Sequence, residues 1–575
     1  MKGITVFEGV GKGNAVVHQQ VERSTLVKKE TIKKEQIETE LVEFQENVKK
    51  AFGELELLKK HALETVGEEE AEIFEAHIMM LEDPMLMDSI KERIENELLQ
   101  GAWAVCKVRD ELVEQFMAID NEYIRARAQD VKDVTDRILG IYLGIEDTDL
   151  GSIREDTIMI APDLKPSETI QLNEFVKGII LEEGSVTSHA AIVAKAKGIP
   201  TIVGVIDACS RIKNNDLVIL DAKKNTILIN PSKEIEEEYQ EILVQQKKEQ
   251  ERLKSLITVP AQTKDGHTIK LYGNVGSVEE AILVKEQGAK GIGLLRTELL
   301  YMDNDHFPTE EEQFSYYKKI AELMEEETII RTLDIGGDKH LPYFNLPKEQ
   351  NPFLGNRAIR LCLTNVELFK TQLKAILRAS HYGKIKIMFP MISCLEELRN
   401  AKEILEEAKR ELKENGNSFD EQIKVGIMVE IPSVAVSADL FAQEVDFFSI
   451  GTNDLCQYTC AVDRMNSEVA HLYQPLHPSI LRLIAMTVEA GKKYHVEVGV
   501  CGEMAGDKDF ATLLMGMGVD ELSMSPAMIN RVKDKIRNST FEEMKSLAEK
   551  VKQTKTSQEA MEIVKEIVKE IVKEE

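Results

Sequence analysis

The chain of 575 residues lacks several features that define other classes of protein. No stretch is apolar for long enough to span a membrane, and the first residues hold no apolar core of the kind that a secretory signal needs. Positive charge is also in deficit, because 72 Lys and Arg face 101 Asp and Glu, for a net charge of -29. Such a chain is a poor partner for nucleic acid or an anionic membrane, whereas a basic protein would be attracted to it.

Cysteine is scarce, and the seven cysteines are scattered without the spacing of metal-ligand pairs. An odd number of isolated cysteines is typical of reduced thiols in a cytoplasm. Hydrophobic residues make up 43% of the chain and charged residues 30%, which is typical of a soluble globular protein. We therefore expect a cytoplasmic protein of about two to four domains, with no membrane insertion and no nucleic-acid partner.

The stretch around His189 carries the most specific local signal. A strand-like apolar run at 178–181 precedes it, and a small, helix-favouring run at 190–198 follows. Thr187 or Ser188 can cap that helix, which places His189 in its first turn, where free N–H groups and the helix dipole favour an anion. A neutral imidazole there could attack a phosphoryl group. A histidine that merely begins a helix would show the same local pattern, so the rest of the chain has to decide.

Changes of periodicity divide the first half of the chain. Residues 23–143 are rich in Glu, Lys and Leu at helical spacing, and they predict an inserted all-α subdomain. The flanking segments 1–22 and 144–230 contain short strand-like runs, which we interpret as one α/β domain interrupted by the helices. Residues 231–260 predict one long connecting helix, which suits a chain in which one part swings against another.

In residues 261–575, strand-like and helical runs alternate about eight times, as a (β/α)8 barrel requires. The third and sixth strand-like runs extend over 328–334 and 446–454. An open Rossmann-type sheet is the alternative, but it would normally use fewer strands. The expected fold class is therefore multidomain α/β: a swivelling α/β domain with an all-α insertion, followed by a TIM barrel.

In a barrel of this kind, residues at the carboxyl ends of the strands face the active site. Arginine forks pair with carboxylate and phosphate groups, and Mg²⁺ usually takes one or two carboxylates together with water and phosphate oxygens. Glu430 and Asp454 have the positions and chemistry for Mg²⁺. Cys501 is a candidate proton donor, although a cysteine in such a place is more often a small buried hydrophobe. The candidate residues at these strand ends are Arg296, Arg331, Arg357, Glu430, Asn453, Asp454, Arg464 and Cys501.

These motifs together resemble enzyme I of the bacterial phosphoenolpyruvate-dependent sugar phosphotransferase system. The likeness covers essentially the whole chain: the helical insertion, the run 187–191, the linker and every barrel motif. In that family a histidine takes the phosphoryl group from phosphoenolpyruvate, releases pyruvate, and passes the group to a histidine of the small carrier protein HPr. The resemblance also implies a homodimer formed through the barrel domain.

The resemblance implies a role for each matching residue. His189 would be the phosphorylated residue, Cys501 the proton donor, and Glu430 and Asp454 the Mg²⁺ ligands. Thr169 matches a threonine that contacts the histidine, with a spacing to His189 that is one residue longer here. The residues that would contact the substrate are Arg296, Arg331, Arg357, Asn453, Asp454 and Arg464.

The helical insertion is the expected platform for HPr. Glu68 and Glu69 lie near Met79, Met80 and Leu81 in the sequence, and acids beside apolar residues suit an electrostatically steered, transient interface. An ordinary amphipathic helix has the same pattern, so the methionines could equally be core residues.

Two other functions compete with this interpretation. A phosphoenolpyruvate synthase or pyruvate phosphate dikinase has similar swivel and barrel domains, but it needs an ATP-binding domain before the histidine. Here a helical block and a few strands precede His189, without a glycine-rich phosphate loop carrying a lysine. A non-catalytic regulator built on the same scaffold would be expected to lack some of the charged strand-end residues, all of which are present.

Overall fold

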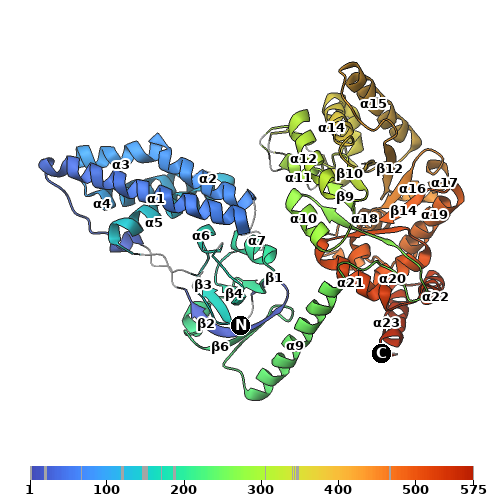
Figure 1. The fold of residues 1–575 in the computed structure, drawn as a ribbon, viewed down its shortest axis with the longest axis horizontal. Helices are drawn as coiled ribbons and strands as arrows, with labels where there is room; N and C mark the ends of the chain where they lie inside the picture. The colour runs from blue at the N-terminus through green and yellow to red at the C-terminus, as the bar shows by residue number, and fades with distance from the viewer. Residues whose placement is uncertain are drawn as a thin grey trace. The chain divides into compact units, whose positions relative to one another are not determined.

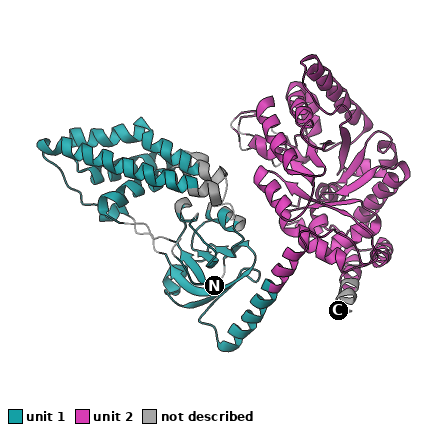
Figure 2. Cartoon of the chain, viewed as in Figure 1, with its two compact units in different colours: residues 1–247 teal, residues 248–575 magenta. Residues whose placement is uncertain are grey.

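A computed structural model describes residues 3–573 apart from 19–22, 66–67, 118–121, 146–149, 151–152, 170, 185–188, 303, 305, 338, 340, 342, 345–346, 348, 465 and 467. The chain divides into two compact units, Met1–Lys247 and Lys248–Glu575 (Figure 2). Among the described residues, no helix is both long and apolar enough to cross a membrane.

The α/β part of the first unit is a seven-stranded sheet with the order β1-β5-β4-β3-β2-β6-β7. Its four central strands, β2 to β5, run parallel, and the strands at both edges pair antiparallel. The strands are β1 (Ile4–Phe7), β2 (Val10–Val17), β3 (Thr157–Ala161), β4 (Val176–Leu181), β5 (Thr201–Val203), β6 (Leu217–Asp221) and β7 (Thr226–Ile229). Because β2 pairs directly with β3, the helical block between them is an insertion, as the sequence predicted.

Both faces of this sheet are covered, which explains the apolar runs 158–161 in β3 and 179–181 in β4. Ile158 and Ile180 pack into the core on one face, while Met159 and Ile179 pack into the core on the other. The sheet carries the short helices α6 (Pro166–Thr169), α7 (His189–Ala196) and α8 (Ala208–Arg211).

The insertion is a helical bundle around Phe44, Phe74, Ile90 and Ile138 (Figure 1). Its elements are η1 (Arg23–Leu26), η2 (Lys34–Gln36), α1 (Ile37–Thr65), α2 (Glu68–Glu82), α3 (Pro84–Glu97), α4 (Gly101–Met117) and α5 (Glu122–Leu143). Lys165, just before α6, forms a 2.9 Å ion pair with Asp136 on α5, so the bundle is tied to the sheet domain near α6. The helix α9 (Lys233–Ser255) follows the sheet domain.

The second unit is a closed barrel of eight parallel strands surrounded by helices, and the TIM-barrel prediction is confirmed. The strands are β8 (Lys270–Val275), β9 (Ile292–Arg296), β10 (Thr328–Arg331), β11 (Ile385–Phe389), β12 (Lys424–Val429), β13 (Phe447–Ile450), β14 (Glu497–Val500) and β15 (Glu521–Met524). Leu294, Ile329, Met388 and Phe447 help to fill the interior, so the barrel is a packed core and not a pore.

The helices of this unit that are described are α10 (Val278–Glu286), α11 (Glu298–Met302), α12 (Glu310–Leu323), α13 (Ile359–Thr364), α14 (Val366–Ala379), α15 (Leu395–Glu414), α16 (Pro432–Val436), α17 (Ala438–Phe441), α18 (Thr452–Cys460), α19 (Pro478–Tyr494), α20 (Lys508–Met517), α21 (Pro526–Arg537), α22 (Phe541–Lys552) and α23 (Ser557–Lys573). Three 3-10 turns lie between them: η4 (Pro352–Leu354), η5 (Ala470–Leu472) and η6 (Glu503–Gly506).

Candidate active site

A buried ion-pair network lies where β10 ends, and we call this end of the barrel the mouth. Arg331, the last residue of β10, is 6% exposed and contacts Glu298 at 2.5 Å and Asp334 at 3.1 Å. Arg357 contacts the other oxygen of Asp334 at 2.9 Å. Lys339 bridges the two carboxylates, at 2.8 Å from Glu298 and 3.0 Å from Asp334.

The cations of this network outweigh its acids. Burial by itself would raise the pKa of Glu298, but Arg331 and Lys339 hold it below its ordinary value. The same two cations, together with Arg357, outweigh burial at Asp334 and hold its pKa well below the usual range. Both carboxyl groups are therefore ionised, and two negative charges face three positive ones. The excess positive charge makes this part of the mouth attractive to an anion.

Two guanidinium donors in the network have no protein acceptor. Within the described part of the chain, Arg331 Nε and Arg357 Nε are buried without a hydrogen-bond partner. The other nitrogens of Arg357 are used, because Nη1 donates to the hydroxyl of Tyr458 at 3.2 Å. An unsatisfied buried donor of a charged group costs more than about 1–3 kcal/mol, so the arrangement favours an external acceptor such as a phosphate or carboxylate oxygen.

Arg296 and Arg331 lie beside each other on neighbouring strands. They are register partners in the parallel pairing of β9 and β10, and both are the last residues of their strands. Arg296 is exposed, and none of the ion pairs found among the described residues involves it. One arginine is thus held rigidly by carboxylates, while its neighbour is free to engage a ligand.

The carboxyl groups of Glu430 and Asp454 form the candidate cation site. Glu430 follows β12 and is 1% exposed, and its Oε1 accepts a 2.6 Å hydrogen bond from the backbone N–H of Met391. Burial, with the charges of Asp454 and Asp334, raises the pKa of Glu430 to about 8 against the opposing effect of the two buried arginines. Asp454 lies in the first turn of α18.

This pair fits Mg²⁺. A divalent cation would offset both the burial of Glu430 and its repulsion with Asp454. A Cβ at Gly451 would come within 3.1 Å of Glu430 Oε2, so the glycine keeps the space beside that oxygen open. Among the described residues, no group of three or more His, Cys, Asp or Glu could hold a metal alone. Two carboxylates completed by water and substrate oxygens are the ligand set that Mg²⁺ commonly takes.

Asn453 and Arg464 meet at a third position on the mouth. Asn453 Nδ2 donates to Glu503 Oε1 at 3.0 Å, and the backbone N–H of Glu503 donates back to Asn453 Oδ1 at 3.0 Å. Arg464 Nη1 lies 3.4 Å from the same Glu503 oxygen. The side chain of Glu503 is 77% exposed, so this contact is weak and leaves Arg464 available to a stronger anion.

Cys501 directly follows β14 and is 5% exposed. Its thiol points to the carbonyl of Ile450 at 3.9 Å, and its own carbonyl accepts a 2.9 Å hydrogen bond from Asn274. Burial raises the pKa of Cys501 to about 11, so the thiol stays protonated at neutral pH. A protonated thiol held in this way suits a proton donor better than a nucleophile.

His189 is the first residue of α7, which confirms that a helix begins there. Thr187 and Ser188, the two expected caps, and the side chain of His189 lie outside the described residues. Thr169 is fully buried at the end of α6, and α6 packs against α7. Close to it, His18 Nε2 contacts Glu168 at 2.9 Å.

The candidate carrier-binding residues are not equivalent in the structure. On α2, the side chain of Met79 is 63% exposed, whereas Met80 is partly buried against the core of the bundle. Leu81 is 4% exposed and packs in that core, so its side chain is not available to a partner. The side chains of Glu68 and Glu69 lie outside the described residues. Of this set, Met79 remains as an exposed apolar contact.

The sequence did not identify Glu298 and Asp334 as the counter-ions of the mouth arginines. Glu298 lies two residues after Arg296, and Asp334 three residues after Arg331. The signal that could have found them is the same strand-end position that identified the arginines.

The comparisons with known proteins agree over most of the chain. Three family models of phosphoenolpyruvate-utilising enzymes match: the N-terminal domain over residues 2–127, the mobile domain over 153–225, and the phosphoenolpyruvate-binding domain over 250–541. The phosphoenolpyruvate-protein phosphotransferase of Bacillus subtilis (strain 168) is 45% identical over 98% of this chain and 99% of that protein. Those of Priestia megaterium and Staphylococcus carnosus (strain TM300) are 46% and 44% identical, over 90% and 98% of this chain and 91% and 98% of theirs.

Proposed function

Because the chain belongs to the family of the phosphoenolpyruvate-protein phosphotransferases, we propose that it moves the phosphoryl group of phosphoenolpyruvate to its own His189 and then to HPr. Pyruvate is released in the first step, and the reaction is the first step of the sugar phosphotransferase system. The observation that carries this proposal is the pair of buried arginines at the mouth, each with an unpartnered Nε, beside the carboxyl groups of Glu430 and Asp454.

The arginines would bind and orient the two anionic groups of the substrate. Arg331 and Arg357 are held in place by Asp334, so their free N–H groups are positioned before the substrate arrives. Arg296 and Arg464, which are less constrained, would close on the phosphate. Phosphoryl transfer depends mainly on positioning and charge stabilisation, which such a cluster supplies.

Glu430 and Asp454 would hold Mg²⁺. When bound, the cation would draw charge from the phosphate oxygens. Asn453 lies next to Asp454 in the first turn of α18 and presents its amide on the same rim, where it fits a substrate oxygen.

In the chemical step, a neutral ring nitrogen of His189 attacks phosphorus in line, and the bond between phosphorus and the enolate oxygen breaks. The enolate takes the proton of the Cys501 thiol at carbon and becomes pyruvate. The phosphoryl group then passes from the histidine to a histidine of HPr. The N-terminal position of His189 on α7 favours the phosphorylated state, since the helix dipole stabilises negative charge there. Thr169, at the end of the neighbouring α6, is the candidate for orienting the ring.

We assign the parts of the chain accordingly. Segments 1–22 and 144–230 form the phosphohistidine domain, 23–143 the HPr-binding subdomain, 231–260 the linker, and 261–575 the substrate-binding barrel. HPr would dock on the helical subdomain, where Met79 offers an exposed apolar contact.

We also propose a homodimer formed through the barrel. Val436, Leu440 and Met486 are exposed by 59%, 49% and 39%. They lie on α16, α17 and α19, and α19 contacts both of the other helices. Exposed apolar side chains on adjoining helices are typical of an interface. We also propose that the protein is cytoplasmic. The seven cysteines are all free, as is typical of proteins in a reducing compartment.

The alternative function, a phosphoenolpyruvate synthase or pyruvate phosphate dikinase without its ATP domain, has less support. The curated relatives match over nearly their whole length, and they are named as protein phosphotransferases. That correspondence includes the helical insertion, where those enzymes would need an ATP-binding domain.

The test is incubation with ³²P-labelled phosphoenolpyruvate and Mg²⁺, followed by mapping of an acid-labile, base-stable phosphate. The wild-type chain should be labelled at His189 and should transfer the label to HPr, and His189→Ala should take up no label while it still binds phosphoenolpyruvate. Labelled ATP is the second arm. If His189→Ala still took up label, the assignment of His189 as the nucleophile would be wrong. Labelling from ATP would favour the alternative function.

A further inference from the structure

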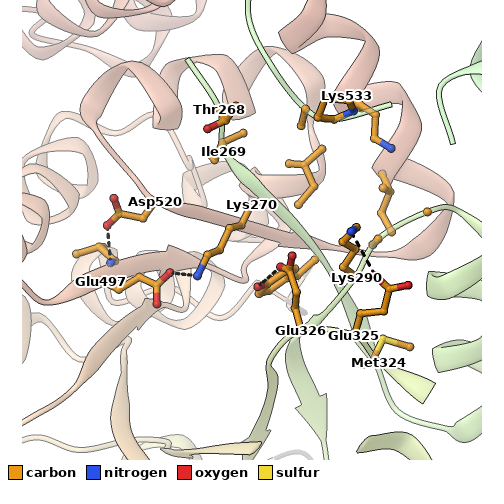
Figure 3. A pocket seen from close by; sticks show the side chains of 18 of the residues that line it. Thr268, Ile269, Lys270, Lys290, Met324, Glu325, Glu326, Glu497, Asp520 and Lys533 are labelled. Carbon is orange, nitrogen blue, oxygen red and sulfur yellow. Dashed lines mark hydrogen bonds and ion pairs between the residues drawn. The ribbon is translucent and has the colours of Figure 1, made fainter. Parts of the chain in front are cut away.

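A pocket lies at the end of the barrel where the strands begin. This pocket has a volume of 1360 Å³ and is bordered by the starts of β8, β14 and β15, by α21 and by the segment after α9 (Figure 3). Pockets that bind small molecules commonly measure about 300–1,000 Å³, so there is ample space for a metabolite. Because the mouth is at the carboxyl ends of the same strands, this pocket is separate from the proposed catalytic site.

One wall of the pocket is apolar, and a buried cation lies on it. Ile257, Val259, Leu271 and Met324 supply apolar surface. Lys533 on α21 is 3% exposed, and its ammonium donates to two backbone carbonyls, those of Leu256 at 3.0 Å and Ile257 at 3.3 Å. Both acceptors are neutral.

Lys533 differs from Lys270, a half-buried lysine that also lines the pocket, in having no counter-ion. In the described part of the chain no carboxylate lies within ion-pair distance of it, whereas Lys270 contacts both Glu327 and Glu497. Burial, with the nearby Arg537, lowers the pKa of Lys533 to about 8. A buried ammonium of this kind would be stabilised by an anion placed beside it.

The rim of the pocket adds positive charge. Lys285, Lys492 and His495 line it and are exposed, and Lys290 is paired with Glu325 on the same rim (Figure 3). The lining as a whole holds five lysines and four acids, Glu325, Glu326, Glu497 and Asp520, so its balance is slightly positive on a chain with a net charge of -29. The acids are engaged by lysines or backbone N–H groups at Glu325, Glu497 and Asp520, whereas Lys533 has no carboxylate partner among the described residues.

We propose that this pocket binds an amphipathic organic anion, whose charged group lies beside Lys533 and whose apolar part contacts Ile257 and Val259. The proposal does not depend on the phosphotransferase activity. The charged group can be a carboxylate or a phosphate, since a lysine ammonium is a compact charge that binds either anion.

The position of the pocket couples an occupant to α9. Three residues of α21 hold the end of that helix and the segment after it. Lys533 donates to the two carbonyls, Arg537 donates to the carbonyl of Pro260 at 2.9 Å, and Asp534 pairs with Arg252 at 2.7 Å. An anion beside Lys533 would compete with the carbonyls for its ammonium. Binding in the pocket would therefore change how firmly the end of the connecting helix is anchored.

The first experiment uses the full-length protein and the fluorescent anion 8-anilinonaphthalene-1-sulfonate. Lys533→Met should raise its dissociation constant about tenfold, the effect of losing one charge-assisted contact. Met324→Glu, which keeps Lys533 and its carbonyl contacts but adds a negative charge to the wall, should weaken binding as well. Lys413→Met, on the exposed side of α15, is the matched control and should bind like the wild type. Unchanged binding by either pocket variant overturns the proposal.

The second experiment identifies the class of anion and the coupling. Citrate and AMP compete with the dye: displacement by citrate assigns a carboxylate ligand and displacement by AMP a phosphate ligand. Failure of both to displace it overturns the proposal. With the effective competitor bound, hydrogen exchange of the amides of residues 256–259, 261 and 262 should change in the wild type and not in Lys533→Met. Equal exchange in the two proteins would refute the link to α9.

Discussion

Where the strands of the barrel begin, Lys270 and Lys386 alternate with Glu327 and Glu497, and each lysine contacts both glutamates at 2.6–3.1 Å. We call this end the floor. At the mouth, three cations share two carboxylates, and the guanidinium Nε atoms of Arg331 and Arg357 find no acceptor among the described residues. The four charged residues of this floor ring are thus paired with one another, whereas donors at the mouth are left without a partner.

The difference separates two uses of buried charge. A closed ring of ion pairs leaves nothing for a ligand to gain, so the floor ring has a structural role. An incomplete network is costly to the apo protein and gains from an anion, so the mouth has a binding role. Both networks are carried by the same strands. Strand ends that are a few residues apart in the sequence should therefore respond differently to substitution, in rate at one end and in stability at the other.

The largest expected effect is on β14, which begins at Glu497 on the floor and is followed by Cys501 at the mouth. Cys501→Ala should lower the rate of pyruvate formation about 10²–10⁴-fold, because a positioned proton donor contributes that much. Its stability should change little, since a small buried side chain is replaced by another. A coupled assay of pyruvate release measures the rate.

Glu497→Gln is the matched variant on the same strand. It should keep the wild-type rate per folded molecule, because it weakens only the floor ring. A wild-type rate in Cys501→Ala, or a slow reaction in Glu497→Gln, would contradict the assignment of catalysis to the mouth and of a structural role to the floor ring.

The second effect is on stability. Lys386 is 3% exposed, and Lys386→Met leaves Glu327 and Glu497 with Lys270 alone. Breaking a buried pair costs about 3–5 kcal/mol, so the free energy of unfolding of the barrel should fall by that amount while the catalytic rate is unchanged. Trp103, the single tryptophan, lies on α4 in the other unit, so calorimetry and not tryptophan fluorescence should follow the barrel. An unchanged barrel transition would mean that the ring contributes nothing.

The third effect concerns β9, which has Lys290 before its start and Arg296 at its end. Arg296→Met should lower the phosphorylation rate of His189 about 10²–10³-fold, since one preorganised charge contact to the reacting group is lost. Its melting temperature should not move, because Arg296 is exposed and the fold does not use it. Lys290→Met removes an exposed ion pair with Glu325. It should leave the phosphorylation rate unchanged and should change the free energy of unfolding by no more than about 0.5 kcal/mol. Equal rates in the two variants would contradict a binding role for the mouth.

The sequence predicted the barrel because each of its strands is an apolar run set between amphipathic helices. It was less accurate where strands end. The third run was expected over 328–334, but β10 ends at Arg331, and the chain then leaves the sheet so that Asp334 can turn back to contact that arginine. Within the sixth run, 446–454, β13 ends at Ile450 and α18 begins at Thr452. Apolar residues continue past the end of β10, at Leu333 and Ile335, so periodicity alone could not detect that boundary. After β13 the chain reads Gly-Thr-Asn-Asp, and the error there came from extending the strand through polar residues.

Site residues could be predicted from the sequence where their position at a strand end identified them. They could not be predicted where their role depends on contacts with residues from other segments. Arg331 and Glu430 follow from the strand-end rule. Lys339 could not be recognised, because its contacts with Glu298 and Asp334 join three separate segments. The same holds for Leu81, whose burial depends on packing between helices of the bundle.

The smallest expected effect is on the pH dependence of the stability of the barrel, measured in the wild type and in a variant without the buried carboxyl group of Glu521. Glu521, the first residue of β15, is 3% exposed, and burial, with Glu497 and Glu327, raises its pKa to about 8 against Lys386 and Lys270. Because this carboxyl group is protonated in the folded barrel and ionised in the unfolded chain between about pH 4.5 and 8, its contribution to stability falls as pH rises through that window. In Glu521→Gln that loss is absent, so between about pH 6 and pH 9 the variant should lose about 1–3 kcal/mol less stability than the wild type. Calorimetry of the barrel transition at the two pH values measures the difference, and parallel losses would mean that Glu521 is ionised in the folded floor and belongs to its ring of charges.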